Sequence, residues 1–286
     1  VGWELQRSLA PMGDVVALDF DTPGALRADF SQPDALPALV DAVAPDVIVN
    51  AAAHTAVDKA EAEPDLARTI NAIAPGVLAQ AAARRGALLV HYSTDYVFDG
   101  SGNAPRTEDA PTGPLSVYGQ TKLEGEQAVR GSGARHLILR TSWVYAARGG
   151  NFARTMLRLA AERERLTVID DQIGAPTGAD LLADITAHCV RAVQADHALV
   201  GTYHAVAGGQ TSWHGYARFV IDTARALKPG LALKVEGIDP VPTSAYPTPA
   251  RRPLNSRLDT GRLQSAFGLH LPHWQAGVRR MLAEVL

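Results

Sequence analysis

The chain has 286 residues, of which 47% are hydrophobic and 20% are charged, and its formal net charge is −3 at pH 7. This mixture is typical of a globular protein and excludes a disordered, collagen-like or coiled-coil chain. The charge argues against nucleic acid or an anionic membrane as a partner, and no apolar run reaches the length of a membrane span. The single cysteine, Cys189, cannot form an internal disulfide, which favours a reducing, cytoplasmic environment.

The first half of the sequence alternates between short apolar runs and longer helical patterns. A helix is expected over residues 1–10, where Leu5 and Leu9 have i, i+4 spacing. The remaining elements expected in this half are strands over 15–19, 47–53, 88–93 and 137–142, and helices over 32–43, 65–85 and 117–130. Because strands spaced by helices of this length form βαβ units, the sequence predicts an α/β fold of the Rossmann type with a doubly wound parallel sheet.

The second half is less regular. Helices are expected over 151–163, 179–194 and 212–227. The proline-rich segment 241–253 is expected to be a loop, because proline removes backbone donors. A length of 286 residues also favours two units, at about 150 residues per domain.

The segment Tyr118-Gly-Gln-Thr-Lys122 is the strongest indication of chemistry. In a helix, residues i and i+4 lie on one face, so the phenol and the ammonium are expected to lie side by side. We expect the ammonium to lower the pKa of the phenol from its usual value of about 10. A tyrosine with such a pKa can donate a proton to a carbonyl oxygen as hydride reaches the carbon. Only four of the 27 basic residues are lysines, so chance explains this spacing poorly.

Polar and small residues at the ends of two expected strands support this interpretation. Thr94 ends the run LLVHYST, where its hydroxyl could bond the same carbonyl oxygen. Asn50 is followed by three alanines, which would let a flat cofactor approach the backbone. Asn71 is a candidate for a buried polar residue that holds neighbouring segments in place. Taken singly, such residues more often cap turns, whereas together and in this order they are far more specific.

These residues carry a resemblance to the extended short-chain dehydrogenase/reductases, and within them to the dTDP-4-dehydrorhamnose reductase family. The resemblance covers nearly the whole chain. The segments that carry it are NAAAHTAVDKAE (50–61), HYSTDYVFDG (91–100), VYGQTKLEGE (117–126), RTSWVY (140–145), NFARTML (151–157), DDQIGAPTGADLLAD (170–184) and YPTPARRPLNSRL (246–258). The sequence departs from the family at its front, where the first strand and the glycine-rich turn of the family are absent.

The resemblance implies a reaction and two domains. The family reduces dTDP-6-deoxy-L-lyxo-4-hexulose with NADPH or NADH and forms dTDP-L-rhamnose. It implies a dinucleotide-binding domain over residues 1–145. The remaining residues, 146–286, would form a smaller α/β substrate-binding lobe, with segments that return to the first domain.

The resemblance also implies roles for individual residues. Tyr118 would donate the proton, and Lys122 would adjust the pKa of Tyr118 and hold the nicotinamide ribose. Thr94 would donate a hydrogen bond to the C4 carbonyl oxygen. Further cofactor-binding residues would be Val1, Gly2, Asp19, Asp29, Phe30, Ala53, His54, Thr55 and Tyr92. Asp95 and Trp143 would border the sugar, and residues around Trp143 and Val57 would discriminate between sugars. Arg252 is a candidate for the diphosphate on chemical grounds, because guanidinium forks suit phosphate, with a solvated surface role as the alternative; Asn151 and Gln172 are further candidates.

The charge of Asp19 bears on the choice between NADH and NADPH. A carboxylate at the end of the expected strand 15–19 would bond the ribose 2′-hydroxyl and repel a 2′-phosphate. No arginine follows it directly to hold such a phosphate. The charge therefore favours NADH, although the family uses both cofactors.

Magnesium is a further expectation that comes from the resemblance alone, since family members are described as magnesium-linked homodimers. The matching acids are Glu4, Asp180 and Glu284, and carboxylate oxygens suit Mg²⁺. Asp180 is shorter than the glutamate that is usual there. The alternative is that these three residues are ordinary surface acids that bind no metal.

Two other functions stay open at this point. One is the reduction of a different nucleotide-linked 4-keto sugar. The other is a non-catalytic regulatory subunit similar to the β subunit of methionine adenosyltransferase. Oxidation of the reduced cofactor in the presence of the dTDP-4-keto sugar separates an enzyme from a regulatory subunit.

Overall fold

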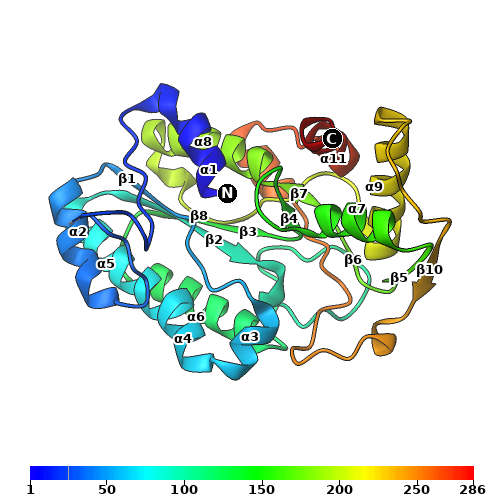
Figure 1. Cartoon of the computed structure of the whole chain (residues 1–286). Coiled ribbons are helices and arrows are strands. Elements are labelled where there is room, and N and C mark those ends of the chain that lie inside the picture. Colours follow the sequence, from blue (N-terminus) through cyan, green and yellow to red (C-terminus); the bar gives the residue numbers. More distant parts are fainter. Residues whose placement is uncertain (25) are drawn as a thin grey trace.

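The computed structural model of the chain describes residues 1–24 and 26–286. Its central sheet consists of parallel strands that are connected through helices (Figure 1). In spatial order these strands are β1 (Val47–Asn50), β2 (Leu88–Thr94), β3 (His136–Thr141) and β8 (Gly201–His204). The sheet confirms the predicted α/β class and the parallel pairing.

Helices cover both faces of this sheet, which explains why its strands are continuous apolar runs. Neighbouring residues of a strand point to opposite faces. Leu88 and Val90 therefore pack with Leu182 of α8, whereas Leu89 packs with Leu78 of α5 on the other side. One face carries α1 (Gly2–Leu9), α8 (Ala179–Ala195) and α10 (Gly261–Phe267); the other carries α2 (Leu36–Val43), α5 (Ala74–Arg85) and α6 (Val117–Gly131).

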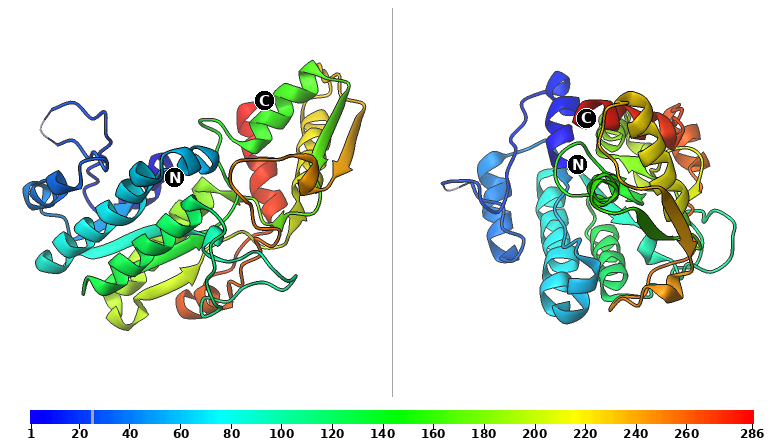
Figure 2. Two further views of the ribbon diagram at one scale, coloured as in Figure 1. Left: turned by 90° about the horizontal axis from the view of Figure 1, so that it is seen from below. Right: turned by 45° about the vertical axis from the view of Figure 1, so that its right-hand side comes forward.

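A second group of elements lies beyond the carboxyl ends of these strands (Figure 2). Its core is rich in aromatic residues and includes Tyr145, Tyr216 and Trp274. Its elements are α7 (Phe152–Glu162), α9 (Trp213–Leu227), α11 (Trp274–Val285) and the strand pairs β5 (Arg165–Ile169) with β10 (Gly237–Val241), β4 (Val144–Tyr145) with β7 (Thr177–Gly178), and β6 (Ile173–Gly174) with β9 (Thr211–Ser212). The division of the chain after residue 145 stays a prediction.

The prediction of a strand over residues 15–19 is wrong. Residues 14–19 have no regular secondary structure, and Val15 and Val16 are 42% and 53% exposed. Within the described residues, β1 pairs with β2 on one side and with no strand on the other. A strand needs a neighbour for its backbone groups, and residues 15–19 have none.

The single long helix expected over residues 65–85 is divided in the structure. Helix α4 (Pro64–Arg68) is followed by a π-helical turn (Thr69–Ile73), and α5 begins at Ala74. The break places Pro75 in the first turn of α5, where a proline costs no hydrogen bond. It also turns Asn71 inward, where the side chain is fully buried.

The other helices follow the expected ranges to within a few residues, but several strands of the second half were missed. Among these are β5, β8 and β10. Strand β10 contains Pro240, which is tolerated because β10 is an edge strand that pairs only with β5 in the described part of the chain. No helix among the described residues has the length and apolarity needed to cross a lipid bilayer.

Helix α6 packs unusually close to two neighbouring segments, and glycines make this possible. A Cβ atom at Gly125 would lie 2.1 Å from the carbonyl oxygen of Asn71. At Gly119 it would lie 2.3 Å from the carbonyl oxygen of Tyr96, in the 3₁₀ turn Asp95–Val97 after β2. Side chains at these positions would force α6 away from both segments.

We predict that Gly125→Ala destabilises the protein by about 1–3 kcal/mol, the usual cost of overpacking. Gly131→Ala, at the end of the same helix, is the matched control, since its Cβ would meet nothing within 4 Å. Added to a helix in open space, the methyl group should be neutral or stabilising by up to about 1 kcal/mol. Urea unfolding of both variants measures the difference, and equal effects would contradict the packing argument.

Candidate active site

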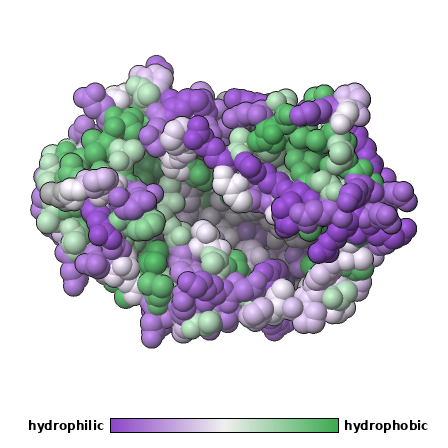
Figure 3. Space-filling model, in the orientation of Figure 1, coloured by the Kyte–Doolittle hydropathy of each residue, from purple (hydrophilic) through white to green (hydrophobic). Residues whose placement is uncertain are grey.

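The candidate site lies at the carboxyl edge of the sheet, where β1 ends at Asn50 and β2 ends at Thr94. The surface is hollowed near the centre of the face shown in Figure 3, between the sheet with its helices and the second group of elements. Parallel sheets bind ligands at this edge.

Tyr118 and Lys122 come to this edge from the first turns of α6. The hydroxyl of Ser116 caps the helix by accepting from the N–H of Gly119 at 3.2 Å. Tyr118 is half-buried, and its ring lies edge-on to that of Tyr96 with centroids 5.4 Å apart. The predicted spacing on one helix face is therefore present.

The expected effect of Lys122 on Tyr118 is wrong in this structure. Burial raises the pKa of Tyr118 to about 12, and its contact with Thr94 acts in the opposite direction. Lys122 is not among the groups that shift the pKa of Tyr118, and its Nζ donates to the carbonyl oxygen of Tyr92 at 2.7 Å. The phenol is consequently held in its protonated form.

Lys122 is itself buried, with 2% of its surface exposed. Burial lowers the pKa of Lys122 to about 8, against the attraction of Glu126 one turn later. Glu126 is occupied by Arg140, whose guanidinium donates to both carboxylate oxygens at 2.8 and 2.7 Å. The Lys122 side chain can therefore lose or regain a proton near neutral pH.

Thr94 and Asp95 form one hydrogen-bonded unit after β2. The Thr94 hydroxyl accepts from the N–H of Tyr96 at 3.2 Å and donates to Oδ1 of Asp95 at 3.0 Å. Asp95 is 2% exposed, and its Oδ2 has no hydrogen-bond partner among the described residues. Burial raises the pKa of Asp95 to about 6, and hydrogen bonds from Ser256 and Thr94 limit the rise.

The amino end of α1 points at the loop that follows β1. Gly2 opens this helix, and a Cβ atom there would lie 3.9 Å from that of Ala51. No side chain caps the helix, so its first N–H groups face this edge of the sheet. Such a terminus attracts anions, and the exposed alanines 51 and 52 leave room beside it.

Asn71 holds this loop in place. Its Oδ1 accepts from the N–H of His54 at 2.8 Å, and its Nδ2 donates to the carbonyl oxygen of His54 at 3.1 Å. The same Nδ2 lies 3.2 Å from the hydroxyl of Thr121 on α6. The π-helical turn that contains Asn71 thus joins the β1 loop to the helix of Tyr118 and Lys122.

Two tryptophans form an aromatic platform against the core of the second group of elements. Trp143 and Trp213 stack with ring centroids 3.7 Å apart. Gln172 fixes Trp213 by accepting from the indole N–H at 3.0 Å, and it donates to Thr243 at 3.1 Å. Trp143 has a φ of 48°, in the left-handed region that non-glycine residues seldom adopt.

Arg252 connects the proline-rich loop to the helix that follows the β1 loop. Its guanidinium binds both carboxylate oxygens of Asp58 in α3 (Val57–Ala62), at 2.7 and 3.1 Å. Asp58 also accepts from the N–H of Ala250 at 3.2 Å. The pKa of Asp58 falls because of this arginine.

Other predicted site residues lie further from this cluster or have local partners. Val57 opens α3, and Ala53 and Thr55 lie in the loop before it. The phenol of Tyr92 bonds Thr186 at 2.5 Å, and Asn151 caps α7. Three more predicted cofactor residues, Asp19, Asp29 and Phe30, lie in the irregular segment between α1 and α2. The carboxylate of Asp19 accepts from the N–H of Phe20, and that of Asp29 accepts from the N–H of Ser31. Phe30 packs near Val40.

The three expected magnesium ligands do not form a set within one chain. Among the residues that the structure describes, no three or more His, Cys, Asp or Glu side chains are placed to hold a metal. Glu4 lies 3.5 Å from Arg7, and Asp180 lies 3.6 Å from Arg280 on α11, the helix that also carries the exposed Glu284. A shared site between two copies stays a prediction.

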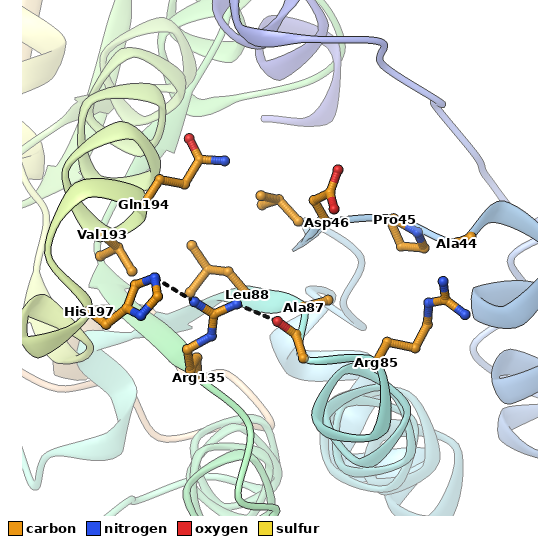
Figure 4. Close-up of a pocket in the computed structure, with 12 residues that line it drawn as sticks. Ala44, Pro45, Asp46, Arg85, Ala87, Leu88, Arg135, Val193, Gln194 and His197 are labelled. Carbon is orange, nitrogen blue, oxygen red and sulfur yellow. Dashed lines mark hydrogen bonds between the residues drawn. The ribbon is translucent and has the colours of Figure 1, made fainter.

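A separate pocket of about 480 Å³ lies at the opposite end of the sheet (Figure 4). Asp46, Val47 and Leu88, at the starts of β1 and β2, line it. Arg135 crosses it and donates to His197 at 2.8 Å. It contains no predicted site residue.

Three residues of this edge were absent from the predicted site, namely Asp58, His91 and Trp213. His91 carried a weak signal, as a histidine within an apolar strand. Asp58 and Trp213 act through partners that are far away in sequence, and no local pattern marks them.

Comparison with known proteins gives consistent matches over the whole chain. The chain matches the family described as RmlD substrate binding domain over residues 1–286. It is 57% identical to the dTDP-4-dehydrorhamnose reductase of Salmonella typhimurium over 285 residues, which cover 100% of this chain and 94% of the relative. It is 55% identical to the dTDP-4-dehydrorhamnose reductase of Escherichia coli K12, with the same coverage.

Solved structures of dTDP-4-dehydrorhamnose reductases are also similar to this chain. A dTDP-4-dehydrorhamnose reductase from Clostridium acetobutylicum is 35% identical and superposes with a TM-score of 0.87, covering 99% of this chain and 95% of that one. The dTDP-4-dehydrorhamnose reductase from Bacillus anthracis, in complex with NADP, is 34% identical with the same TM-score and coverage.

We predict a pH-dependent contribution of Asp95 to stability. Its pKa in the folded protein is about 6, above the ordinary value, so the native state binds the proton more tightly than the unfolded state. Stability from this group should be greatest below about pH 4 and decline until about pH 6. Asp95→Asn should remove that decline, so its Tm relative to the parent should rise across this window. A Tm difference that does not change with pH would show that Asp95 ionises normally.

Proposed function

Because the chain belongs to the dTDP-4-dehydrorhamnose reductase family, we propose that it reduces the C4 keto group of dTDP-4-dehydro-L-rhamnose to give dTDP-L-rhamnose. The observation that carries this proposal is the convergence of Tyr118, Lys122 and Thr94 at the carboxyl edge of the sheet. A proton donor, a buried lysine and a hydroxyl are what carbonyl reduction requires of the protein.

The residues at this edge fit a nicotinamide dinucleotide. The uncapped amino end of α1, with Val1 and Gly2, suits the diphosphate, and the alanines after β1 leave room for it. NADPH or NADH would supply the hydride when bound. The Bacillus anthracis relative is named as a complex with NADP, whereas the exposed carboxylate of Asp19 favours a ribose 2′-hydroxyl, so we propose that both cofactors are used.

Tyr118 gives the proton in this mechanism. Its raised pKa keeps the phenol protonated at neutral pH, and an alkoxide that develops on the sugar is more basic than a phenolate. Thr94, in contact with Tyr118, bonds the carbonyl oxygen and orients it toward the phenol. Lys122 stabilises the phenolate that remains and restores its proton, because its own pKa of about 8 lies close to the working pH.

The sugar nucleotide would lie between this edge and the second group of elements. Trp143, stacked on Trp213, offers a flat apolar face to the sugar, and Asp95 and Val57 border the same space. Arg252, with Asn151 and Gln172, would serve the diphosphate, since a guanidinium matches phosphate oxygens. Residues 1–145 would thus hold the cofactor and most of 146–286 the substrate, as a Rossmann-type domain with a smaller lobe.

A magnesium-linked homodimer through Glu4, Asp180 and Glu284 is a separate prediction. Helices α1 and α8 pack against each other, and Arg280 of α11 reaches Asp180, so the three helices share one side of the molecule. Mg²⁺ should therefore raise the dimer fraction, and a chelator should lower it. Sedimentation with and without chelator measures this, and an unchanged oligomeric state would rule the metal link out.

Turnover of the dTDP-4-keto sugar, followed by the absorbance of NADPH or NADH, tests the proposed reaction. Turnover only with another nucleotide-linked 4-keto sugar would assign the protein to a different reductase. Lack of turnover with retained binding of a partner enzyme would favour a regulatory subunit.

Tyr118→Phe should lose most of kcat, by about 10²-fold or more, while cofactor affinity changes little, because only the donated proton is removed. Tyr203→Phe, in β8, is the matched control: its hydroxyl bonds the carbonyl oxygen of Leu199 and takes no part in the site. Near-normal turnover of Tyr118→Phe would show that another group donates the proton.

Lys122→Met should lower kcat and weaken cofactor binding together, since Lys122 is proposed both to tune Tyr118 and to hold the nicotinamide ribose. Methionine keeps the length of the side chain and removes its three donors. Steady-state kinetics and cofactor titration by fluorescence separate the two effects. Loss of only one of them would remove the corresponding role from Lys122.

A further inference from the structure

Glu61 binds the start of the helix that carries Tyr118 and Lys122. One oxygen of its carboxylate, Oε1, accepts from the backbone N–H of Val117 at 2.8 Å. Val117 is the first residue of α6, and Tyr118 follows it directly. Glu61 comes from α3, 56 residues earlier in the chain, and α3 lies beside α6 (Figure 1).

The contact with Glu61 differs in kind from the local cap of the same helix. The first N–H groups of a helix have no partner within the helix, and the hydroxyl of Ser116 binds one of them, at Gly119. This cap fixes the residue at which α6 begins, but it moves with the helix, because Ser116 directly precedes it in the chain. The contact between Glu61 and Val117 instead ties the first turn to another helix.

Helix α3 is itself held in place on two sides. Ala60 is fully buried, which packs the helix against the body of the molecule. Asp58, three residues before Glu61 and therefore on the same face, receives the guanidinium of Arg252 and the N–H of Ala250. A carboxylate on a helix held in this way sets the position of the group that it binds.

Tyr118 depends on the first turn of α6 more than Lys122 does. Lys122 lies one turn later, and its Nζ has a partner of its own in β2, the carbonyl oxygen of Tyr92 at 2.7 Å. Tyr118 reaches Thr94 from the first turn, with its ring edge-on to that of Tyr96. A looser first turn would therefore displace the phenol, whereas Lys122 would keep its contact with β2.

We propose that Glu61 is a positioning residue, which holds the first turn of α6, and with it the hydroxyl of Tyr118, at the end of β2. The role requires the acceptor oxygen of Glu61 rather than its charge, because a backbone N–H needs only a lone pair. Water would satisfy the N–H of Val117 in a variant without this oxygen, but it would not tie the turn to α3. The proposal rests on the proposed function, in which Tyr118 donates the proton.

Glu61→Ala should separate turnover from cofactor binding. We expect kcat to fall by about 10- to 100-fold, as a small displacement of a reacting group can cause, while the Kd of NADPH stays within about twofold of the parent value. Glu61→Gln keeps an acceptor oxygen and should bring kcat back to within about threefold of the parent. Steady-state kinetics and cofactor titration by fluorescence measure these values. Equal losses of kcat and cofactor affinity, or no recovery in Glu61→Gln, would overturn the proposal.

Glu124→Ala is the matched control, because Glu124 also joins α6 to a neighbouring helix through a carboxylate. It binds Arg68 of α4 at 2.9 Å, about two turns after Val117. Both side chains of this pair are partly exposed, and such ion pairs contribute little to stability. We expect kcat to be unchanged. A loss of kcat as large as that in Glu61→Ala would show that any weakening of α6 lowers turnover, and it would overturn the proposal.

Amide hydrogen exchange tests the same contact without turnover. Mass spectrometry of peptic fragments that span residues 113–123 follows the first turn of α6. We expect faster exchange in Glu61→Ala than in the parent, and exchange close to that of the parent in Glu61→Gln and Glu124→Ala. Unchanged exchange in Glu61→Ala would overturn the proposal. Absence of turnover in the parent chain would instead count against the proposed function, and the exchange rates would still show whether Glu61 holds the turn.

Discussion

The close packing of α6 against the segments that follow β1 and β2 is the constraint on which the candidate site depends. Gly119 and Gly125 let the helix backbone meet the carbonyl groups of Tyr96 and Asn71. This contact brings Tyr118 to the end of β2 and buries Lys122 against β2. The buried pair of Glu126 and Arg140 then ties the same helix to β3.

Burial, rather than attraction between neighbours, governs the protons of the site. It raises the pKa values of Tyr118 and Asp95 and lowers that of Lys122. Each shift favours the neutral form, as expected where water is excluded. A neutral phenol that keeps its proton, beside a lysine that readily exchanges one, suits proton donation to a carbonyl better than a pre-formed phenolate would.

Specific contacts join the sheet and its helices to the second group of elements. Arg252 of the proline-rich loop binds Asp58 of α3. Trp143, two residues after the end of β3, stacks on Trp213 of α9. Gln172 fixes the second tryptophan. The reacting groups therefore come from the sheet and α6, whereas the surface that would select the sugar comes from segments distant in sequence.

The sequence by itself determined the features that depend on local pattern. The apolar run 88–93 predicted β2, and the helix expected over 117–130 corresponds to α6, where helical geometry alone placed Tyr118 and Lys122 on one face. Only the tertiary structure decided the rest, because it depends on partners far along the chain. Residues 15–19 form no strand without a neighbour, β5 exists as the partner of β10, and the π-helical turn turns Asn71 inward. The direction of the Tyr118 pKa shift belongs here too, since it is set mainly by burial, which depends on the packing of distant segments.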